Sequence, residues 1–224
     1  MSDFLQVVSA CRDRGFRCNC FVDVGANNGD IAIQFRRIFP DAAGYMVEPN
    51  PHLQGGLQGV QRKHNIAYLP VACGAEDRRD VLRFNLTDGY RGGSLRVNPA
   101  TRGNDFFDQF VEVQQRSLDS LLATGEIAPP NLLKLDVEGM ELEVLNGAKT
   151  VLPTVEIVCL ETMLFRNWVT HPKFSEVIDY MQRIGFVVYD FGAFGRRPYD
   201  KALMVVDLVF AREDSPLRSY HDWA

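Results

Sequence analysis

The segment 20–38 constrains the fold most, because it joins a short apolar run to a glycine turn and then to a helical pattern. Cys20 to Val24 is long enough for a buried strand, and the chain turns at Gly25. Apolar residues at 31, 33, 35 and 38 follow at mixed helical spacing, and Pro40 ends that helix. A strand, a tight turn and a helix in this order form the unit from which parallel α/β sheets are built.

The same unit recurs along the chain, after an expected helix within residues 1–18. Further strands are predicted over 45–47, 66–72, 132–136, 155–160, 186–189 and 203–210, and helices over 52–63, 138–148 and 174–184. This rhythm predicts a Rossmann-like α/β fold, with a mostly parallel sheet and helices on both faces. The last two strands are joined by a glycine-containing loop without a helical pattern, which predicts a hairpin and an antiparallel last strand.

Residues 75–130 interrupt this rhythm. Two alternating runs, 81–86 and 110–116, flank a glycine-rich stretch, and the pattern predicts an inserted hairpin-like element with a long loop. Such a loop can close over a substrate, so Tyr90 and Ser94 are candidate substrate contacts and the insert is expected to shape the substrate site. The length of 224 residues is compatible with one domain over 1–224.

Composition narrows the class of partner. The net charge of −5 disfavours a nucleic-acid binder, and no apolar run reaches the length of a membrane span. The cysteine count of five is odd and no signal peptide is visible, so we expect free thiols in a reducing, cytoplasmic compartment. The expected partner is therefore a small molecule, with no nucleic acid and no membrane. A homo-oligomer is neither predicted nor excluded.

The glycine turn lies where α/β sheets bind ligands, at the carboxyl end of the first strand. Glycines let the backbone turn tightly and approach a ligand, and Asp23 at the strand end could accept from a ligand ammonium group. The spacing of Gly25 and Gly29 is neither the G-x-G-x-x-G dinucleotide fingerprint nor a Walker phosphate loop. The turn alone is a weak signal.

Glu48 strengthens the prediction of a ligand site at this turn. This acid stands 19 residues after Gly29, at the end of the next strand and before Pro49. A carboxylate there can accept two hydrogen bonds from a ribose diol. The expected ligand therefore has an amino-acid end near Asp23 and Gly25 and a ribose at Glu48. S-adenosylmethionine matches this description better than a dinucleotide does.

Three stretches resemble the FkbM family of S-adenosylmethionine-dependent methyltransferases: Phe21-Val-Asp-Val-Gly-Ala-Asn-Asn-Gly29, Val47-Glu-Pro-Asn-Pro51 and the segment 132–148 with its Asp-Val-Glu-Gly-Met-Glu core. The tail 206–210 also resembles the family's closing strand. The resemblance implies a class I methyltransferase fold, with a seven-stranded sheet whose last strand is antiparallel. It also implies methyl transfer, usually to an oxygen of a sugar or another natural-product scaffold. The cofactor-binding residues predicted on this basis are Asp23, Gly25, Ala26, Asn27, Gly29, Glu48, Pro49 and Ala72.

A second group of candidates carries the chemistry. Asp136 ends the strand at 132–136, Glu138 follows it, and Glu161 ends the next strand. A carboxylate can take the proton of a hydroxyl nucleophile as general base, or carboxylates such as Asp136 and Glu161 can hold Mg²⁺ that lowers the hydroxyl pKa. The sequence does not decide between base and metal. His171 is an alternative base and a candidate substrate contact.

Other functions remain open at this point. Transfer to a carboxylate or a nitrogen competes with O-methylation, and a non-catalytic S-adenosylmethionine-binding domain would keep the same motifs. A nucleotide-linked oxidoreductase shares the use of an acid at Glu48, but the missing dinucleotide fingerprint argues against it.

Overall fold

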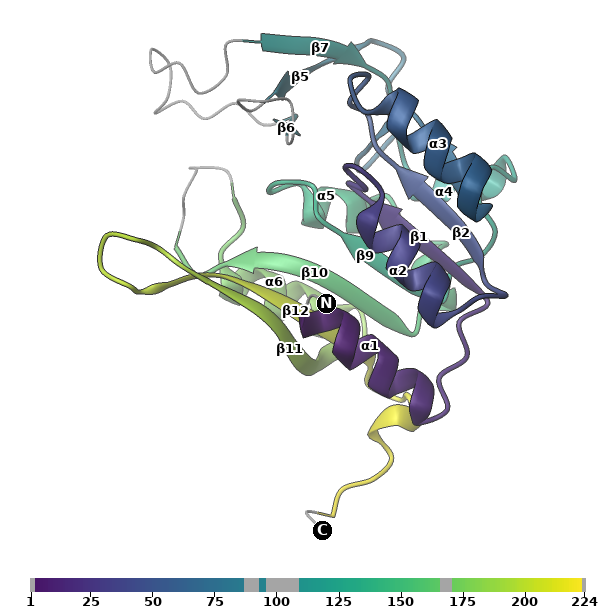
Figure 1. The fold of residues 1–224 in the computed structure, drawn as a ribbon. Helices are drawn as coiled ribbons and strands as arrows, with labels where there is room; N and C mark the ends of the chain where they lie inside the picture. The colour runs from purple at the N-terminus through teal and green to yellow at the C-terminus, as the bar shows by residue number, and fades with distance from the viewer. Residues whose placement is uncertain (1–2, 87–92, 96–108, 166–170, 223–224) are drawn as a thin grey trace.

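The computed structural model describes residues 3–86, 93–95, 109–165 and 171–222. A seven-stranded sheet in the order β11-β12-β10-β9-β1-β2-β3 forms its centre (Figure 1). Strands β3, β2, β1, β9 and β10 are mutually parallel, and β12 runs antiparallel to both β10 and β11. The seven-stranded sheet with an antiparallel last strand is thus confirmed. Its strands are β1 (Cys20–Val24), β2 (Ala43–Val47), β3 (Ala67–Leu69), β9 (Leu132–Leu135), β10 (Ile157–Met163), β11 (Phe186–Arg196) and β12 (Leu203–Arg212).

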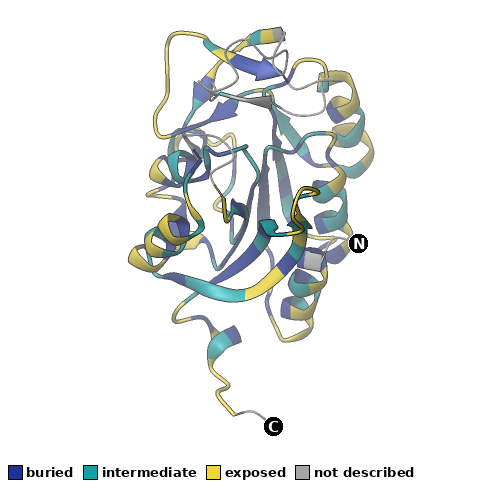
Figure 2. Ribbon diagram, turned by 90° about the vertical axis from the view of Figure 1, so that its left-hand side faces the viewer, coloured by how far each residue is buried: buried dark blue, intermediate teal, exposed yellow. Residues whose placement is uncertain are grey.

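Helices cover both faces, as the alternation of side chains along the strands requires. Phe21 of β1 packs in one apolar cluster with residues of α1, α2 and α3, whereas Val22 and Val24 pack in another with residues of α4, α5 and α6. The strands are buried between these layers and the exposed residues lie mostly on the outer helix surfaces (Figure 2). The helices are α1 (Asp3–Asp13), α2 (Asp30–Ile38), α3 (Gln54–His64), α4 (Leu118–Ala123), α5 (Glu141–Asn146) and α6 (Phe174–Arg183).

The expected insert forms a small sheet of its own. β5 (Leu82–Leu86) pairs antiparallel with β7 (Gln109–Val113), as the two alternating runs predicted. Two further pairings surround this hairpin-like element: β6 (Gly93–Ser94) joins the other edge of β5, and β8 (Gln115–Arg116) pairs with β4 (Ala72–Cys73). This small sheet and the β11–β12 hairpin both extend on the side at which the parallel strands end (Figure 1).

Several predicted elements have different bounds, and three of the differences have a clear structural reason. The strand predicted over 66–72 ends at Leu69, because Pro70 has no N–H to donate, and β4 then belongs to another sheet. The strand predicted over 186–189 continues to Arg196 as one side of a bulged hairpin. The helix predicted over 138–148 covers only Glu141–Asn146, because Glu138 and Gly139 have left-handed φ values of 53° and 95° that no α-helix accepts.

Two further findings concern the cysteines and the length of the helices. All five cysteines are buried free thiols. None of the helices within the described residues is both long and apolar enough to cross a membrane.

Candidate active site

The glycine turn is held between the ends of three strands. Gly25 has a φ of 75°, and its N–H donates to the carbonyl of Val47 at 2.9 Å. A Cβ at Gly25 would overlap the backbone carbonyl of Asp136, so the tight approach that requires glycine is to the end of β9. Gly29 (φ 82°) precedes α2 as its N-cap. The turn therefore lies at the switch point of the sheet, between β1 and β9, where open α/β sheets bind ligands.

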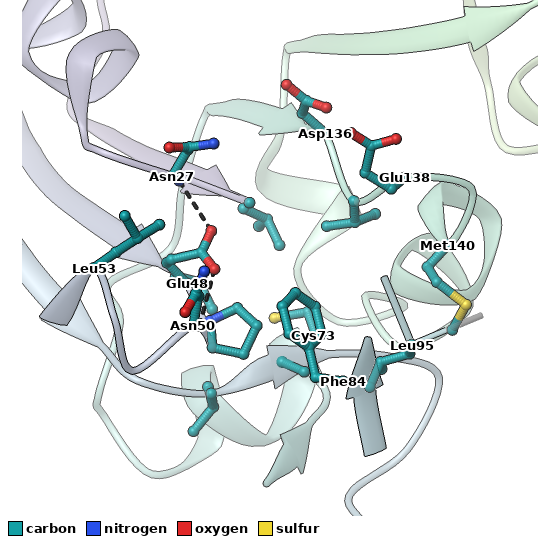
Figure 3. A pocket seen from close by; sticks show the side chains of 17 residues that line it. Asn27, Glu48, Asn50, Leu53, Cys73, Phe84, Leu95, Asp136, Glu138 and Met140 are labelled. Atoms are coloured by element: carbon teal, nitrogen blue, oxygen red, sulfur yellow. Dashed lines mark hydrogen bonds between the residues drawn. The ribbon is translucent and has the colours of Figure 1, made fainter. Parts of the chain in front are cut away.

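Glu48 is the acid that organises the other side of the turn. One carboxylate oxygen accepts from the N–H of Asn27 at 2.9 Å and the other from the N–H of Asn50 at 3.0 Å (Figure 3). Burial raises the pKa of Glu48, and these two backbone donors oppose the rise. Each carboxylate oxygen has a second lone pair that can accept from a ligand hydroxyl.

Glu48 lines a cavity at this edge of the sheet, which we call the Glu48 cavity. It encloses about 100 Å³ and opens to solvent. Asn27 and Glu48 face Asp136 and Glu138 across it, and Cys73, Phe84 and Leu95 lie along its lower side in this view (Figure 3). Its lining residues are Val24, Gly25, Asn27, Val47, Glu48, Pro49, Asn50, Leu53, Val71, Ala72, Cys73, Phe84, Leu95, Asp136, Val137, Glu138 and Met140.

The structure brings together most of the residues predicted to bind the cofactor. Gly25, Asn27, Glu48, Pro49 and Ala72 line the Glu48 cavity. Ala26 is instead packed in the core beneath the turn, and Gly29 lies against Met46 and Leu57. Sequence reasoning missed Phe84 and Leu95, which reach the cavity because the small sheet folds beside it, and nothing in their local sequence marks them.

Asp23 is not placed as predicted. Its side chain is fully buried and does not line the Glu48 cavity, so in this conformation it cannot receive a ligand ammonium group there. The ammonium group that it faces is that of Lys134, whose Nζ lies 3.3 Å from Oδ1 of Asp23. Burial raises the pKa of Asp23 and the charge of Lys134 opposes that rise. A lysine within an otherwise apolar strand was the available sequence signal for this pair.

The loop between β9 and α5 presents the second acidic group. Glu141 is buried, and its carboxylate accepts from the N–H groups of Val137 and Gly139 at 3.1 and 3.2 Å. Glu141 is the first residue of α5, and its buried side chain fixes the loop before the helix. Glu138 lines the Glu48 cavity, and burial together with the charges of Asp136 and Glu141 raises its pKa to about 7.

Asp136 also lines a second cavity, which we call the Asp207 cavity. This space of about 180 Å³ contacts Phe4 of α1 and Ile31 of α2, and among the described residues Asp136 alone lines both cavities. Glu161 and Asp207, direct neighbours across β10 and β12, line it together with Lys134. Burial and then the charges of Asp136, Glu138, Asp207 and Glu141 raise the pKa of Glu161 to about 8. The apolar part of its lining is Phe4, Ile31, Leu135, Cys159 and Leu160.

The remaining candidates differ in how far the structure locates them. His171 is buried against Gly139, where a Cβ would overlap its ring, and it lines a small cavity with Glu141 and Glu161. Ser94 lies in β6, where it pairs with Asn85. Tyr90 lies outside the described residues.

The predicted alternative of a metal site gains no support from the geometry. Among the side chains that the structure describes, no three His, Cys, Asp or Glu residues gather as a metal site would need. The carboxylates of Asp136 and Glu161 line a common cavity, but they belong to no such group.

Comparison with known proteins agrees with this arrangement. The family model of the methyltransferase FkbM domain matches residues 23–188. The hexuronic acid methyltransferase AglP of Haloferax volcanii is 30% identical over 139 residues, which cover 62% of this chain and 54% of AglP. The 2-O-methyltransferase NoeI of Sinorhizobium fredii is 24% identical over 152 residues, 62% of this chain and 61% of NoeI. The chain thus matches little more than half the length of these curated relatives.

Solved structures share the fold. The crystal structure of an FkbM methyltransferase from Methylobacillus flagellatus aligns with a TM-score of 0.53 at 15% identity, over 88% of this chain and 46% of that one. A magnesium protoporphyrin IX methyltransferase from Synechocystis, solved with bound S-adenosylmethionine, aligns with a TM-score of 0.52 at 11% identity, over 93% and 78% of the two chains. The fold is therefore that of class I methyltransferases. Since the family model covers most of its length, the chain belongs to the FkbM family of S-adenosylmethionine-dependent methyltransferases.

Proposed function

We propose that this protein transfers a methyl group from S-adenosylmethionine to a hydroxyl group of a sugar or a related natural-product scaffold. The observation that carries the proposal is the position of Asp136, which lines both the Glu48 cavity and the Asp207 cavity. A carboxylate at this junction can contact an acceptor in one cavity while the cofactor lies in the other. The names of the two curated relatives, a hexuronic acid methyltransferase and a 2-O-methyltransferase, support a sugar acceptor.

The residues of the Glu48 cavity suit the cofactor. Glu48 offers a second lone pair on each oxygen to the two ribose hydroxyls. Leu53, Val71 and Phe84 provide an apolar and aromatic surface of the kind that holds an adenine ring. When bound, S-adenosylmethionine supplies a methyl group activated by its attachment to a positively charged sulfur.

The Asp207 cavity suits a polyhydroxylated acceptor. Ionised carboxylates accept hydrogen bonds only, whereas a protonated carboxyl also donates one. With a pKa of about 8, Glu161 is mostly protonated at neutral pH, so Glu161 can donate while Asp136 and Asp207 accept. The apolar residues Phe4 and Ile31 can contact the C–H face of a sugar ring.

The chain's own residues then perform two tasks. They hold the acceptor hydroxyl beside the Glu48 cavity, and such positioning alone can supply a large part of a rate enhancement. Asp136 accepts the hydroxyl proton as general base, a role that typically contributes about 10²- to 10⁴-fold. Glu138, with a pKa of about 7, lines the same wall and can relay that proton to solvent.

The test is methyl transfer from radiolabelled S-adenosylmethionine to a panel of methyl glycosides: a neutral hexoside, an N-acetylhexosaminide and a glucuronide. Wild-type protein is expected to label at least one of them, with an O-methyl group seen in the product by NMR. The Asp136→Asn variant should lose about 10²- to 10⁴-fold in kcat and keep its affinity for S-adenosylhomocysteine, because the side chain keeps its shape but not its basicity.

Other outcomes identify the competing functions. A carboxylate acceptor needs no base, so a small effect of Asp136→Asn at neutral pH would favour transfer to a carboxylate. Labelled product with an N-methyl group would favour a nitrogen acceptor. Saturable binding of S-adenosylmethionine without turnover on any acceptor would favour a non-catalytic domain and contradict the proposal.

A further inference from the structure

Lys134 is a buried cation at the ligand edge of the sheet. It occupies the middle of β9 between Leu133 and Leu135, and only 8% of its side chain is exposed. Its direct neighbours in the sheet are Asp23 on β1 and Cys159 on β10. Lysine is among the residues least often fully buried, so this position calls for a physical explanation.

The ammonium group of Lys134 has three acceptors around it. Nζ lies 3.3 Å from Oδ1 of Asp23, 3.2 Å from Oδ2 of Asp136 and 3.4 Å from the carbonyl oxygen of Gly25. The contacts with Asp136 and Gly25 have the geometry of hydrogen bonds, and the contact with Asp23 is an ion pair. Burial lowers the pKa of Lys134, but the charges of Asp23 and Asp136 raise it by more, which keeps the side chain ionised.

Neutralising Asp23 would not need all three contacts. The pair of Lys134 with Asp23 already compensates this fully buried carboxylate. Asp136 is 43% exposed and water can solvate it, yet Lys134 reaches it as well as the carbonyl of Gly25. A buried ion pair is often no more stabilising than two apolar side chains, so stability alone gives no reason for this arrangement.

Gly25 and Asp136 are the two groups whose relative position matters for methyl transfer. Gly25 lines the Glu48 cavity, and Asp136 lines both cavities. We propose that Lys134 is a positioning residue that holds the glycine turn and the Asp136 carboxylate at a fixed separation. The inference rests on the proposed function, since it assumes that the cofactor binds beside Gly25 and that Asp136 contacts the acceptor.

The test separates this role from that of a structural ion pair. Lys134→Met alone leaves the buried Asp23 without its cation and should lower Tm by at least about 6 °C. The double variant Asp23→Leu/Lys134→Met replaces the whole pair by apolar side chains and should recover a Tm within about 3 °C of wild type. Lys149→Met, at an exposed lysine outside both cavities, is the matched control.

Calorimetric binding of S-adenosylhomocysteine to the apoprotein is the deciding measurement. The stable double variant should bind it at least about tenfold more weakly than wild type, because the Lys134 ammonium no longer holds the turn at Gly25. Asp23→Leu alone keeps the contacts of Lys134 with Gly25 and Asp136, so it should bind more tightly than the double variant. If the apolar pair does not fold, Asp23→Asn/Lys134→Gln also removes the ammonium and takes its place.

Wild-type affinity in a folded double variant would overturn the positioning role and leave Lys134 as a structural ion pair. That result differs from failure of the proposed function. If wild-type protein itself bound no S-adenosylhomocysteine, the methyltransferase proposal would fail, and the role of Lys134 with it. If wild type binds and turns over, kcat of the double variant at saturating substrates should fall further than that of Lys149→Met.

Discussion

The Cα of Gly25 lies so close to the backbone carbonyl of Asp136 that a side chain at position 25 would overlap it. Two hydrogen bonds hold this approach: Gly25 donates to Val47, and Asp136 donates from its N–H to the carbonyl of Val24 at 3.0 Å. The ends of β1, β2 and β9 are thereby locked together beneath the Glu48 cavity. The glycine is required by contact within the protein, in addition to any contact with a ligand.

Substitution of Gly25 by alanine should therefore be severe. The new methyl group meets backbone rather than a flexible side chain, and the φ of 75° is unfavourable for any L-residue. We expect insoluble protein, or soluble protein whose Tm is lower by more than about 6 °C. Gly55→Ala is the control, because this helical glycine has open space around it and alanine there should stabilise by about 0.5–1 kcal/mol. A Gly25→Ala variant as stable as wild type would show that the turn can move away from β9.

Glu48→Gln tests the ribose contact. The change removes the charge and turns one acceptor into a donor, which then faces the N–H of Asn27 or Asn50. Hydrogen bonds to charged groups contribute about 1.5–3 kcal/mol, so affinity for S-adenosylhomocysteine should fall about ten- to a hundredfold. Thermal melting with S-adenosylmethionine, S-adenosylhomocysteine and NAD gives a rapid comparison, in which only the two adenosyl ligands should stabilise wild type. Glu213→Gln, an exposed substitution, should bind as wild type does; equal binding by Glu48→Gln would remove Glu48 from the site.

Local sequence was sufficient for the main features of the sheet. The apolar runs, the turn at Gly25 and the acid at Glu48 each follow from the rule that parallel strands end at one edge, where ligands bind. The antiparallel last strand was predicted because the loop before it contains glycines and has no helical pattern. Such a loop does not form the helical crossover that joins parallel strands. These features depend on neighbours along the chain, which a sequence displays directly.

The features that were missed depend on neighbours across the sheet. The pair of Asp23 with Lys134 becomes visible only when β1 and β9 are aligned residue by residue, and the strands are more than a hundred positions apart. Phe84 reaches the Glu48 cavity because β5 folds back beside it, which no periodicity encodes. The late start of α5, in contrast, could have been predicted from the sequence. Gly139 within the Asp-Val-Glu-Gly stretch indicates a residue with left-handed φ.

Glu161 should make the stability of the fold depend on pH. Its carboxyl has a pKa of about 8 in the fold against 4.5 as the reference value, so the folded state holds a proton that the unfolded chain releases earlier. This contribution is complete below pH 4.5 and is lost as the pH rises towards 8. Glu161→Gln keeps a neutral side chain at every pH. The difference in Tm, variant minus wild type, should therefore increase by about 2–4 °C or more from about pH 5 to about pH 8.5. Parallel Tm curves for the two proteins would show that Glu161 is not protonated in the fold.

The charge of the Asp207 cavity predicts which acceptors are preferred. Asp136 and Asp207 line it together with Glu161, which is mostly protonated at neutral pH, and Lys134 beside them is already in contact with Asp23 and Asp136. A carboxylate on the acceptor would meet like charge, so kcat/KM for a neutral or amino hexoside should exceed that for a glucuronide by at least about tenfold. Asp207→Asn should lower this ratio, mainly by raising kcat/KM for the glucuronide. Raised ionic strength should lower the ratio less, because the cavity is partly shielded from solvent and its ions. Preference for the glucuronide in wild type, unchanged in Asp207→Asn, would place the acceptor outside this cavity.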